Sequence, residues 1–128
     1  MIVDDNSAFL DVIRPLLEGR ELTVVGDATT GAEAIERAGE LSPDLILLDV
    51  DLGEDSGLNV ARQLEQVPGA AVSKVVLISA HPAEDYADLV AETPAIGFLP
   101  KSDLSVAAIQ ELLARHAAAG NHNQRESK

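Results

Sequence analysis

The feature that most constrains the fold is a regular alternation of short apolar runs with longer amphipathic segments. The runs are rich in leucine and β-branched residues, and they occupy residues 1–3, 22–25, 45–48, 75–78 and 96–99. Apolar runs without polar alternation are typical of strands that are buried on both faces of a sheet. The pattern therefore predicts five buried strands, each followed by a helix.

The segments between the runs have the signals of helices. Asp5, Asn6 and Ser7 are candidate caps for the first, and Thr30 with Glu33 forms a capping box at the start of the second. The apolar positions of the last helix recur at helical spacing. The predicted helices cover residues 8–18, 30–40, 58–66, 82–91 (from Pro82 through Tyr86) and a final stretch with Val106, Ile109, Leu112 and Leu113 on its apolar face.

Strands that alternate with helices predict an α/β fold with a parallel sheet and right-handed crossovers. Five repeats in about 118 residues fit a flavodoxin-like (βα)5 three-layer sandwich with strand order 2-1-3-4-5. We expect one domain over residues 1–118. Residues 119–128 are polar and without periodicity, and they are predicted to be a tail or the start of a linker.

Composition excludes several classes of partner. The chain has 128 residues with a formal net charge of −13, so we expect neither nucleic acid nor an anionic membrane surface to bind this domain directly. It contains no cysteine, which excludes thiol catalysis and cysteine zinc sites. No apolar run approaches the roughly 20 residues of a membrane helix, and no secretory signal is present at the start. We expect a cytoplasmic protein.

The residues at the ends of the predicted strands are the candidate site. Ligands of such sheets bind beyond the carboxyl ends of the strands, and these ends carry Asp4 and Asp5, Asp49, Ser79 and Lys101. Clustered carboxylates repel one another unless a cation is present, and their hard oxygen atoms suit Mg²⁺. Asp49 could act as a nucleophile toward phosphorus, with Lys101 and the metal spreading the charge.

These residues closely resemble the receiver domain of bacterial two-component response regulators. The resemblance covers almost the whole chain, and Gly57 also stands where the family usually has glycine. The motifs that carry it are Val3-Asp4-Asp5-Asn6, Leu47-Leu48-Asp49, Ser79-Ala80 and Gly97-Phe98-Leu99-Pro100-Lys101.

The resemblance implies a role for each residue of the site. Asp49 would accept a phosphoryl group from a sensor histidine kinase or a phosphotransfer protein. Asp5 would bind Mg²⁺ directly and Asp4 mainly through water. The remaining roles are a backbone carbonyl ligand from Asp51, a phosphoryl contact from Lys101, and a switch formed by Ser79 and Phe98.

The resemblance also implies how the signal leaves the site. The switch would alter the face made by the fourth helix, fifth strand and fifth helix, and this face would control the output. The receiver would either stand alone or be attached to an effector domain, which in this family is frequently transcriptional. A homodimer through this face is expected by analogy. The domain would be a phosphoacceptor that assists its own phosphorylation and dephosphorylation, not an enzyme with another substrate.

Some positions depart from the family pattern. Gly53 stands where proline is common, and Ser102 rather than proline follows Lys101. The first strand begins at Met1, several residues shorter than usual, so either the start has been trimmed or the strand is short. Asp51 and His81 occupy positions that affect the lifetime of the phosphoryl group.

Two other functions compete with this interpretation. Haloacid dehalogenase phosphatases also use an aspartate after a strand, but there the nucleophile follows the first strand and a further acidic motif follows the lysine. A receiver fold used only for protein interaction is the other alternative. The intact acidic set, serine and lysine disfavour it.

Overall fold

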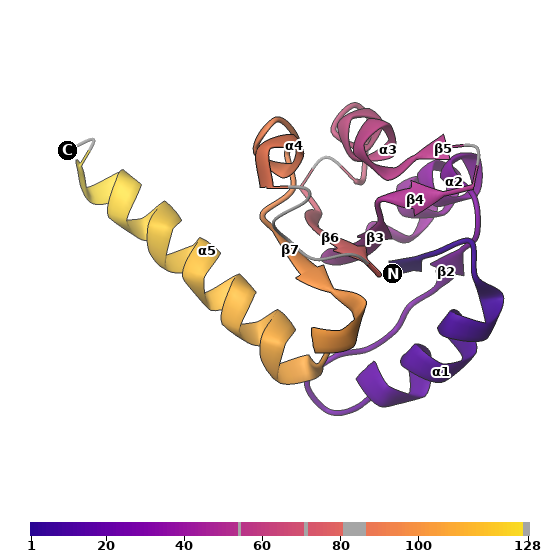
Figure 1. Cartoon of the computed structure of the whole chain (residues 1–128). Coiled ribbons are helices and arrows are strands. Elements are labelled where there is room, and N and C mark those ends of the chain that lie inside the picture. The colour runs from indigo at the N-terminus through magenta and orange to yellow at the C-terminus, as the bar shows by residue number, and fades with distance from the viewer. Residues whose placement is uncertain (54, 71, 81–86, 127–128) are drawn as a thin grey trace.

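Five parallel strands form the central sheet, as the computed structural model of the chain shows (Figure 1). It describes residues 1–53, 55–70, 72–80 and 87–126. The strands lie in the order β2-β1-β3-β6-β7, which is 2-1-3-4-5 in chain order and confirms the predicted topology. Their bounds are Ile2–Val3 (β1), Asp27–Ala28 (β2), Leu45–Asp49 (β3), Lys74–Ser79 (β6) and Gly97–Pro100 (β7).

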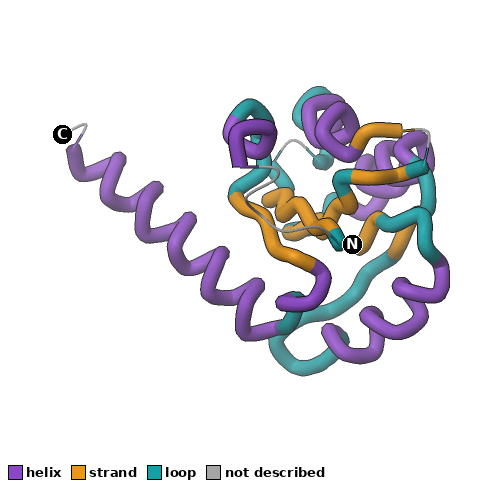
Figure 2. Tube along the Cα trace, viewed as in Figure 1, coloured by secondary structure: helices purple, strands orange, loops and turns teal. Residues whose placement is uncertain are grey.

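The helices alternate with these strands, as Figure 2 shows along the chain. Their bounds are Ser7–Leu17 (α1), Gly31–Leu41 (α2), Gly57–Leu64 (α3), Ala87–Ala91 (α4) and Val106–Glu126 (α5), with a 3-10 turn at Lys101–Asp103 (η2). The expected start of the fourth helix at Pro82 and Tyr86 lies outside the described residues, as does His81.

The last helix is longer than expected. Helix α5 continues through Glu126, so the backbone is helical where we expected an irregular tail after residue 118. Its C-terminal half extends away from the sheet (Figure 1). The division of the chain at residue 118 stays a prediction.

Two apolar clusters, one on each face of the sheet, explain why the strands are apolar throughout. Alternate residues of one strand face opposite sides, so Ile46 and Leu48 of β3 pack on the α2–α3 side while Leu47 packs on the α1–α5 side. Strand β6 divides in the same way, with Leu77 on the first side and Ile78 on the second. The predicted three-layer sandwich is confirmed.

The helix starts follow the predicted caps. The side chain of Asn6 accepts a hydrogen bond from the Phe9 N–H, which identifies the cap of α1 among the three candidates. Thr30 Oγ1 accepts from the Glu33 N–H at 3.1 Å, and Glu33 reaches back to the Thr29 N–H at 3.0 Å. These side chains satisfy backbone donors that have no partner within the helix.

The prediction for the second strand is wrong in its position. Residues 22–25 carry the apolar run, but β2 comprises only Asp27–Ala28. It pairs with β1, where Ile2 lies opposite Asp27. Because β1 begins at Ile2, residues 22–25 have no neighbouring strand with which to form a ladder. A strand needs a partner for its backbone groups as well as an apolar pattern.

A short hairpin follows β3, at the segment where Gly53 departs from the family pattern. Strands β4 (Asp51–Leu52) and β5 (Asp55–Ser56) pair antiparallel. Gly53 has φ of 64° at the turn. Glycine adopts this left-handed conformation without strain, which is why it suits the position.

Gly57 allows α3 to begin against the end of β3. A Cβ atom built there would lie 2.0 Å from the carbonyl oxygen of Asp49 and 2.7 Å from Val50 Cα. We expect Gly57→Ala to lower the free energy of unfolding by about 1–3 kcal/mol, because rigid backbone must move. Gly19→Ala is the matched control, since an added Cβ atom at Gly19 would meet nothing within 4 Å. Equal stability of the two variants in denaturant titrations would contradict the steric explanation.

Among the residues that the structure describes, none of the helices combines the length and the apolar character needed to span a membrane.

Candidate functional site

The predicted site residues meet at the carboxyl edge of the sheet. Asp4 follows β1, Asp49 ends β3, Ser79 ends β6, and Lys101 follows β7. Parallel strands end at the same edge, and their register brings the positions together: Asp49 pairs with Ile78, one residue before Ser79, and Ser79 pairs with Pro100, one residue before Lys101. Asp5 completes the set, since it directly follows Asp4.

Three carboxylates form the acidic part of the site. Oxygen atoms of Asp4, Asp5 and Asp49 all lie within 4.8 Å of one another. Asp4 is fully buried and Asp49 is 4% exposed, whereas Asp5 is open to solvent. Burial of two carboxylates this close together is unfavourable without a compensating cation.

The Lys101 ammonium supplies that compensation in this structure. Its Nζ lies 2.6 Å from Asp4 Oδ2 and donates a hydrogen bond to Asp49 Oδ2 at 3.1 Å. Burial lowers the pKa of Lys101, but the two carboxylates outweigh this effect and raise the pKa above its usual value. Lys101 therefore remains charged and holds the two aspartates together.

The backbone orients the Asp49 carboxylate. The Asp51 N–H donates to Asp49 Oδ1 at 3.0 Å, while Lys101 holds Oδ2. Burial raises the pKa of Asp49 to about 6. The Asp51 N–H and Lys101 lower this pKa and the Asp4 charge raises it. The net effect is a carboxylate that is more basic than an exposed aspartate and remains mostly ionised at neutral pH.

The raised pKa predicts how stability depends on pH. Because the pKa of Asp49 rises from 3.8 to about 6 on folding, its favourable contribution is fully present below pH 3.8 and is lost as the pH rises through about 6. We expect Asp49→Asn to unfold at higher denaturant concentration than the wild type at pH 7.5 without divalent cations, with the difference shrinking toward pH 4. A difference that grows on acidification would contradict the direction of the shift.

Phe9 is a residue of the site that sequence analysis did not identify. The Lys101 Nζ lies 4.5 Å from the centroid of the Phe9 ring. An ammonium is attracted to the face of an aromatic ring, so Lys101 is held by two carboxylates and a ring. The position of Phe9 on the first turns of α1, four residues after Asp5, was the available signal.

We expect Phe9→Leu to slow phosphoryl uptake from acetyl phosphate about two- to fivefold, because a cation–π contact is worth roughly 0.5–1 kcal/mol. When a cation occupies the carboxylates, the Phe9 ring still attracts the Lys101 ammonium and keeps it at the site. A leucine side chain has no aromatic face and cannot attract the ammonium in this way. Phe9→Tyr retains the ring and serves as the control. Mg²⁺ affinity, measured by calorimetry, should be the same in both variants. Equal uptake rates would exclude a role for the ring.

Ser79 and Phe98 differ in burial. Ser79 is fully buried at the end of β6. Phe98, on β7, is partly buried and packs against the α2–α3 core cluster. They lie on neighbouring strands, where Ser79 pairs with Pro100 and Phe98 pairs with Leu77. Their movement as a switch stays a prediction.

The donor set fits a divalent metal ion. Asp4 Oδ2 is buried, and no donor among the described residues makes a well-aligned hydrogen bond to it. Its contact with Lys101 is an ion pair, so this oxygen has unused capacity as a ligand. Two further carboxylates lie within reach, one of them open to solvent. Hard oxygen donors of this kind suit Ca²⁺ or Mg²⁺.

Comparisons with known proteins show which family the chain is similar to. A family model of the response regulator receiver domain matches residues 1–114. The transcriptional regulatory protein DegU of Brevibacillus brevis is 32% identical over 103 residues, which are 79% of this chain and 42% of that protein. The DNA-binding transcriptional activator EvgA of Escherichia coli is 26% identical over 121 residues, covering 94% of this chain and 56% of that protein.

A solved structure shows the same architecture. The LuxR-family two-component response regulator of Aurantimonas is similar with a TM-score of 0.78 and 28% identity, over 92% of this chain and 84% of that one. The chain spans about half the length of the curated relatives it matches. With the family model matching residues 1–114 and the acidic edge in place, the chain belongs to the response regulator receiver domain family.

Proposed function

We propose that Asp49 accepts a phosphoryl group from the phosphohistidine of a sensor histidine kinase or a phosphotransfer protein. The observation that carries the proposal is the bridge from Lys101 to both Asp4 and Asp49 beside the exposed Asp5. An Asp49 oxygen attacks phosphorus, the N–P bond of the donor breaks, and the imidazole nitrogen takes the electron pair. The product is an acyl phosphate on Asp49.

Asp4, Asp5, Asp49 and the backbone carbonyl of Asp51 would hold Mg²⁺ in this proposal. When bound, Mg²⁺ neutralises charge on the phosphoryl oxygens. The protein's own residues orient the reaction. The Asp51 N–H fixes one oxygen of Asp49, and Lys101 is placed to leave Asp4 and follow the phosphoryl oxygens, since its Nζ already lies between the two carboxylates.

Ser79 is proposed to donate a hydrogen bond to the phosphoryl group, with Phe98 following it inward. Phe98 belongs to β7 and Ser79 pairs with Pro100 of β7, so their movement would alter the face formed by α4, β7 and α5. That face would then control an output, and it is the proposed surface of a homodimer. Relatives are transcriptional regulators about twice as long, which supports a DNA-binding effector as the output in a longer protein. A kinase partner of this kind would place the protein in the cytoplasm.

Intact mass spectrometry tests this function. Incubation of the full chain with acetyl phosphate and Mg²⁺ should add one phosphoryl group per chain, and addition of EDTA beforehand should prevent it. A generic phosphoester such as p-nitrophenyl phosphate should show no sustained turnover. Continuous hydrolysis of that ester without a labelled chain would identify a phosphatase and refute the proposal.

A further inference from the structure

The β4–β5 hairpin borders the acidic site at both ends of its first strand. The Asp51 N–H at the start of β4 donates to Asp49 Oδ1 at 3.0 Å. At the turn after β4, a Cβ atom added to Gly53 would lie 3.5 Å from Asp5 Oδ2, an ordinary van der Waals distance. The position of the hairpin therefore helps to set the orientation of the Asp49 carboxylate.

The hairpin is too short to hold its own position. Its strands pair Asp51 with Ser56 and Leu52 with Asp55, and a backbone hydrogen bond closes its base. A two-stranded ribbon is at best marginally stable by itself. Leu52 is buried in the α2–α3 core cluster, but apolar burial has no preferred direction. It holds the hairpin to the core without fixing how the hairpin is turned.

A groove leaves the hairpin room to shift. It has a volume of about 540 Å³, lies between α2 and α3, and is lined by Asp55 and Ser56 of β5. Both residues are exposed. A directional bond from β5 to a fixed part of the molecule is therefore needed to keep the hairpin in one place.

Asp55 makes such a bond. Its Oδ2 accepts a hydrogen bond from the Gly31 N–H at 3.1 Å, and the two residues are 24 positions apart in the chain. Gly31 is the first residue of α2, so its N–H has no partner within the helix. The positive end of the helix dipole favours a carboxylate at this place, and a charged acceptor strengthens the bond.

The bond holds the hairpin more than it holds the helix. The start of α2 already has its capping box, in which Thr30 Oγ1 accepts from the Glu33 N–H and Glu33 accepts from the Thr29 N–H. These contacts define where α2 begins without Asp55. Loss of the Asp55 carboxylate should therefore affect the position of the hairpin more than the start of the helix.

Gly31 leaves just enough space for this carboxylate. A Cβ atom added to Gly31 would lie 3.0 Å from Asp55 Oδ2 and 2.8 Å from Val60 Cγ2. Both distances are shorter than normal contacts, so a larger residue would push the carboxylate or Val60 away. Glycine at the start of α2 and aspartate on β5 are therefore complementary in shape as well as in hydrogen bonding.

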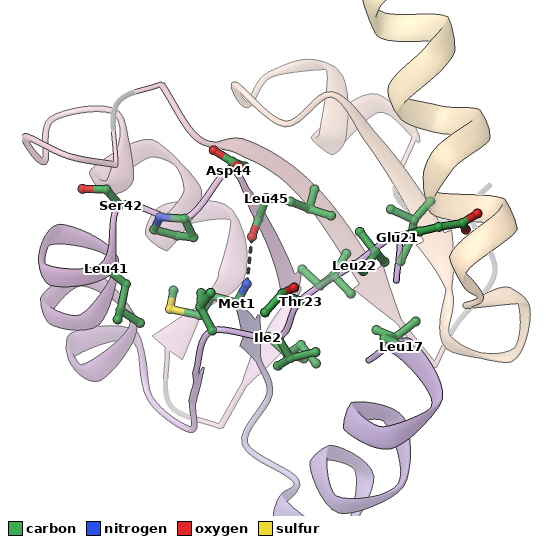
Figure 3. A pocket seen from close by; sticks show the side chains of 15 residues that line it. Met1, Ile2, Leu17, Glu21, Leu22, Thr23, Leu41, Ser42, Asp44 and Leu45 are labelled. Carbon is green, nitrogen blue, oxygen red and sulfur yellow. Dashed lines mark hydrogen bonds between the residues drawn. The ribbon is translucent and has the colours of Figure 1, made fainter. Parts of the chain in front are cut away.

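The start of α2 is fixed relative to the site. The Ala28 carbonyl, shortly before α2, accepts a hydrogen bond from the Asp4 N–H at 3.0 Å. Strand β1 in turn pairs with β3, which ends in Asp49. Figure 3 shows the same two chain segments at the opposite edge of the sheet, where Met1 donates to the Leu45 carbonyl. The bond from Asp55 therefore joins the hairpin to the part of the sheet that carries the acidic residues.

We propose that Asp55 is a positioning residue for phosphoryl transfer. Its bond to Gly31 keeps the hairpin where the Asp51 N–H holds Asp49 Oδ1, so the carboxylate stays in the orientation from which it attacks phosphorus. Asp55 acts through Asp51 and contacts neither the donor nor the metal. The inference rests on the proposed phosphorylation of Asp49.

Three variants of the full chain test this role. Asp55→Ala removes the acceptor, and we expect phosphoryl uptake from acetyl phosphate with Mg²⁺ to be about fivefold slower, because the carboxylate reaches its reactive orientation less often. Asp55→Asn keeps an acceptor oxygen and should stay within about twofold of the wild type, since a neutral acceptor retains the bond. Ser56→Ala is the matched control on β5, where the serine side chain makes no capping bond to α3, and it should match the wild type.

Amide hydrogen exchange separates positioning from general stability. In Asp55→Ala the Asp51 N–H should exchange at least about tenfold faster than in the wild type, with a clearly smaller change at Leu47 and Val76 in the centre of the sheet. Equal acceleration of all three amides would indicate a general loss of stability and would overturn the proposal.

The uptake rates decide the rest. Wild-type uptake by Asp55→Ala would overturn the proposal, and so would uptake that is equally slow in Asp55→Asn, because the acceptor oxygen would then not be what matters. A wild-type chain that takes up no phosphoryl group would refute the proposed function itself. A labelled wild type with an unaffected Asp55→Ala would overturn this inference alone.

Discussion

Asp49→Asn should abolish phosphoryl uptake from acetyl phosphate in the presence of Mg²⁺. The amide that replaces the carboxylate is not a nucleophile toward phosphorus and offers the cation a weaker ligand. Asp49 ends β3 with its two oxygens held by Lys101 and the Asp51 N–H. Asp4 has a matching pair of contacts, from Lys101 and the Asn6 N–H, but it is fully buried. Intact mass spectrometry should show the label reduced to background.

Asp11→Asn is the control for this variant. Asp11 lies on the exposed side of α1, and its substitution removes the same charge without touching the acidic site. This variant should accept one phosphoryl group per chain, as the wild type does. If Asp49→Asn were still labelled while remaining folded, the acceptor would have to be a different residue.

Lys101→Ala should affect stability, metal binding and signalling differently. Without divalent cations we expect the free energy of unfolding to fall by about 2–3 kcal/mol, because the buried Asp4 and Asp49 lose their shared cation. Mg²⁺ affinity should be retained or increased, since Lys101 occupies the same carboxylate oxygens that would bind the metal. Addition of Mg²⁺ should restore part of the lost stability.

The phosphorylated Lys101→Ala protein should fail to change its α4–β7–α5 face, because the ammonium that follows the phosphoryl group is absent. NMR shifts of β7 before and after labelling measure this change. Lys74→Ala removes an exposed lysine at the far end of β6 and should alter neither property. A loss of Mg²⁺ affinity in Lys101→Ala would contradict the assignment of Lys101 to the phosphoryl group.

The parts of the fold that were predicted correctly depend on local signals. Strands β3 and β6 appear as apolar runs because both of their faces are covered. The starts of α1 and α2 depend on Asn6 and Thr30, which bond within three residues. The site was predictable because parallel strands all end at one edge, so any polar residue at a strand end lies near the others.

The parts that were missed depend on contacts between distant segments. The run at residues 22–25 has the apolar character of a strand, but β1 does not extend far enough to pair with it, and Glu18 instead accepts a hydrogen bond from Val24. The place of Phe9 on α1, four residues after Asp5, is only a weak signal in the sequence, and the residue becomes part of the site because Lys101, which follows β7, lies above its ring.

The sequence by itself determined the order of strands and helices and the set of residues at the acidic edge, because apolar periodicity and position along a strand are local properties. Only the tertiary structure decided where β2 forms, that one ammonium bridges Asp4 and Asp49, and that the same ammonium lies over the Phe9 ring. Each of these depends on which backbone or side-chain groups from remote segments are close enough to satisfy one another.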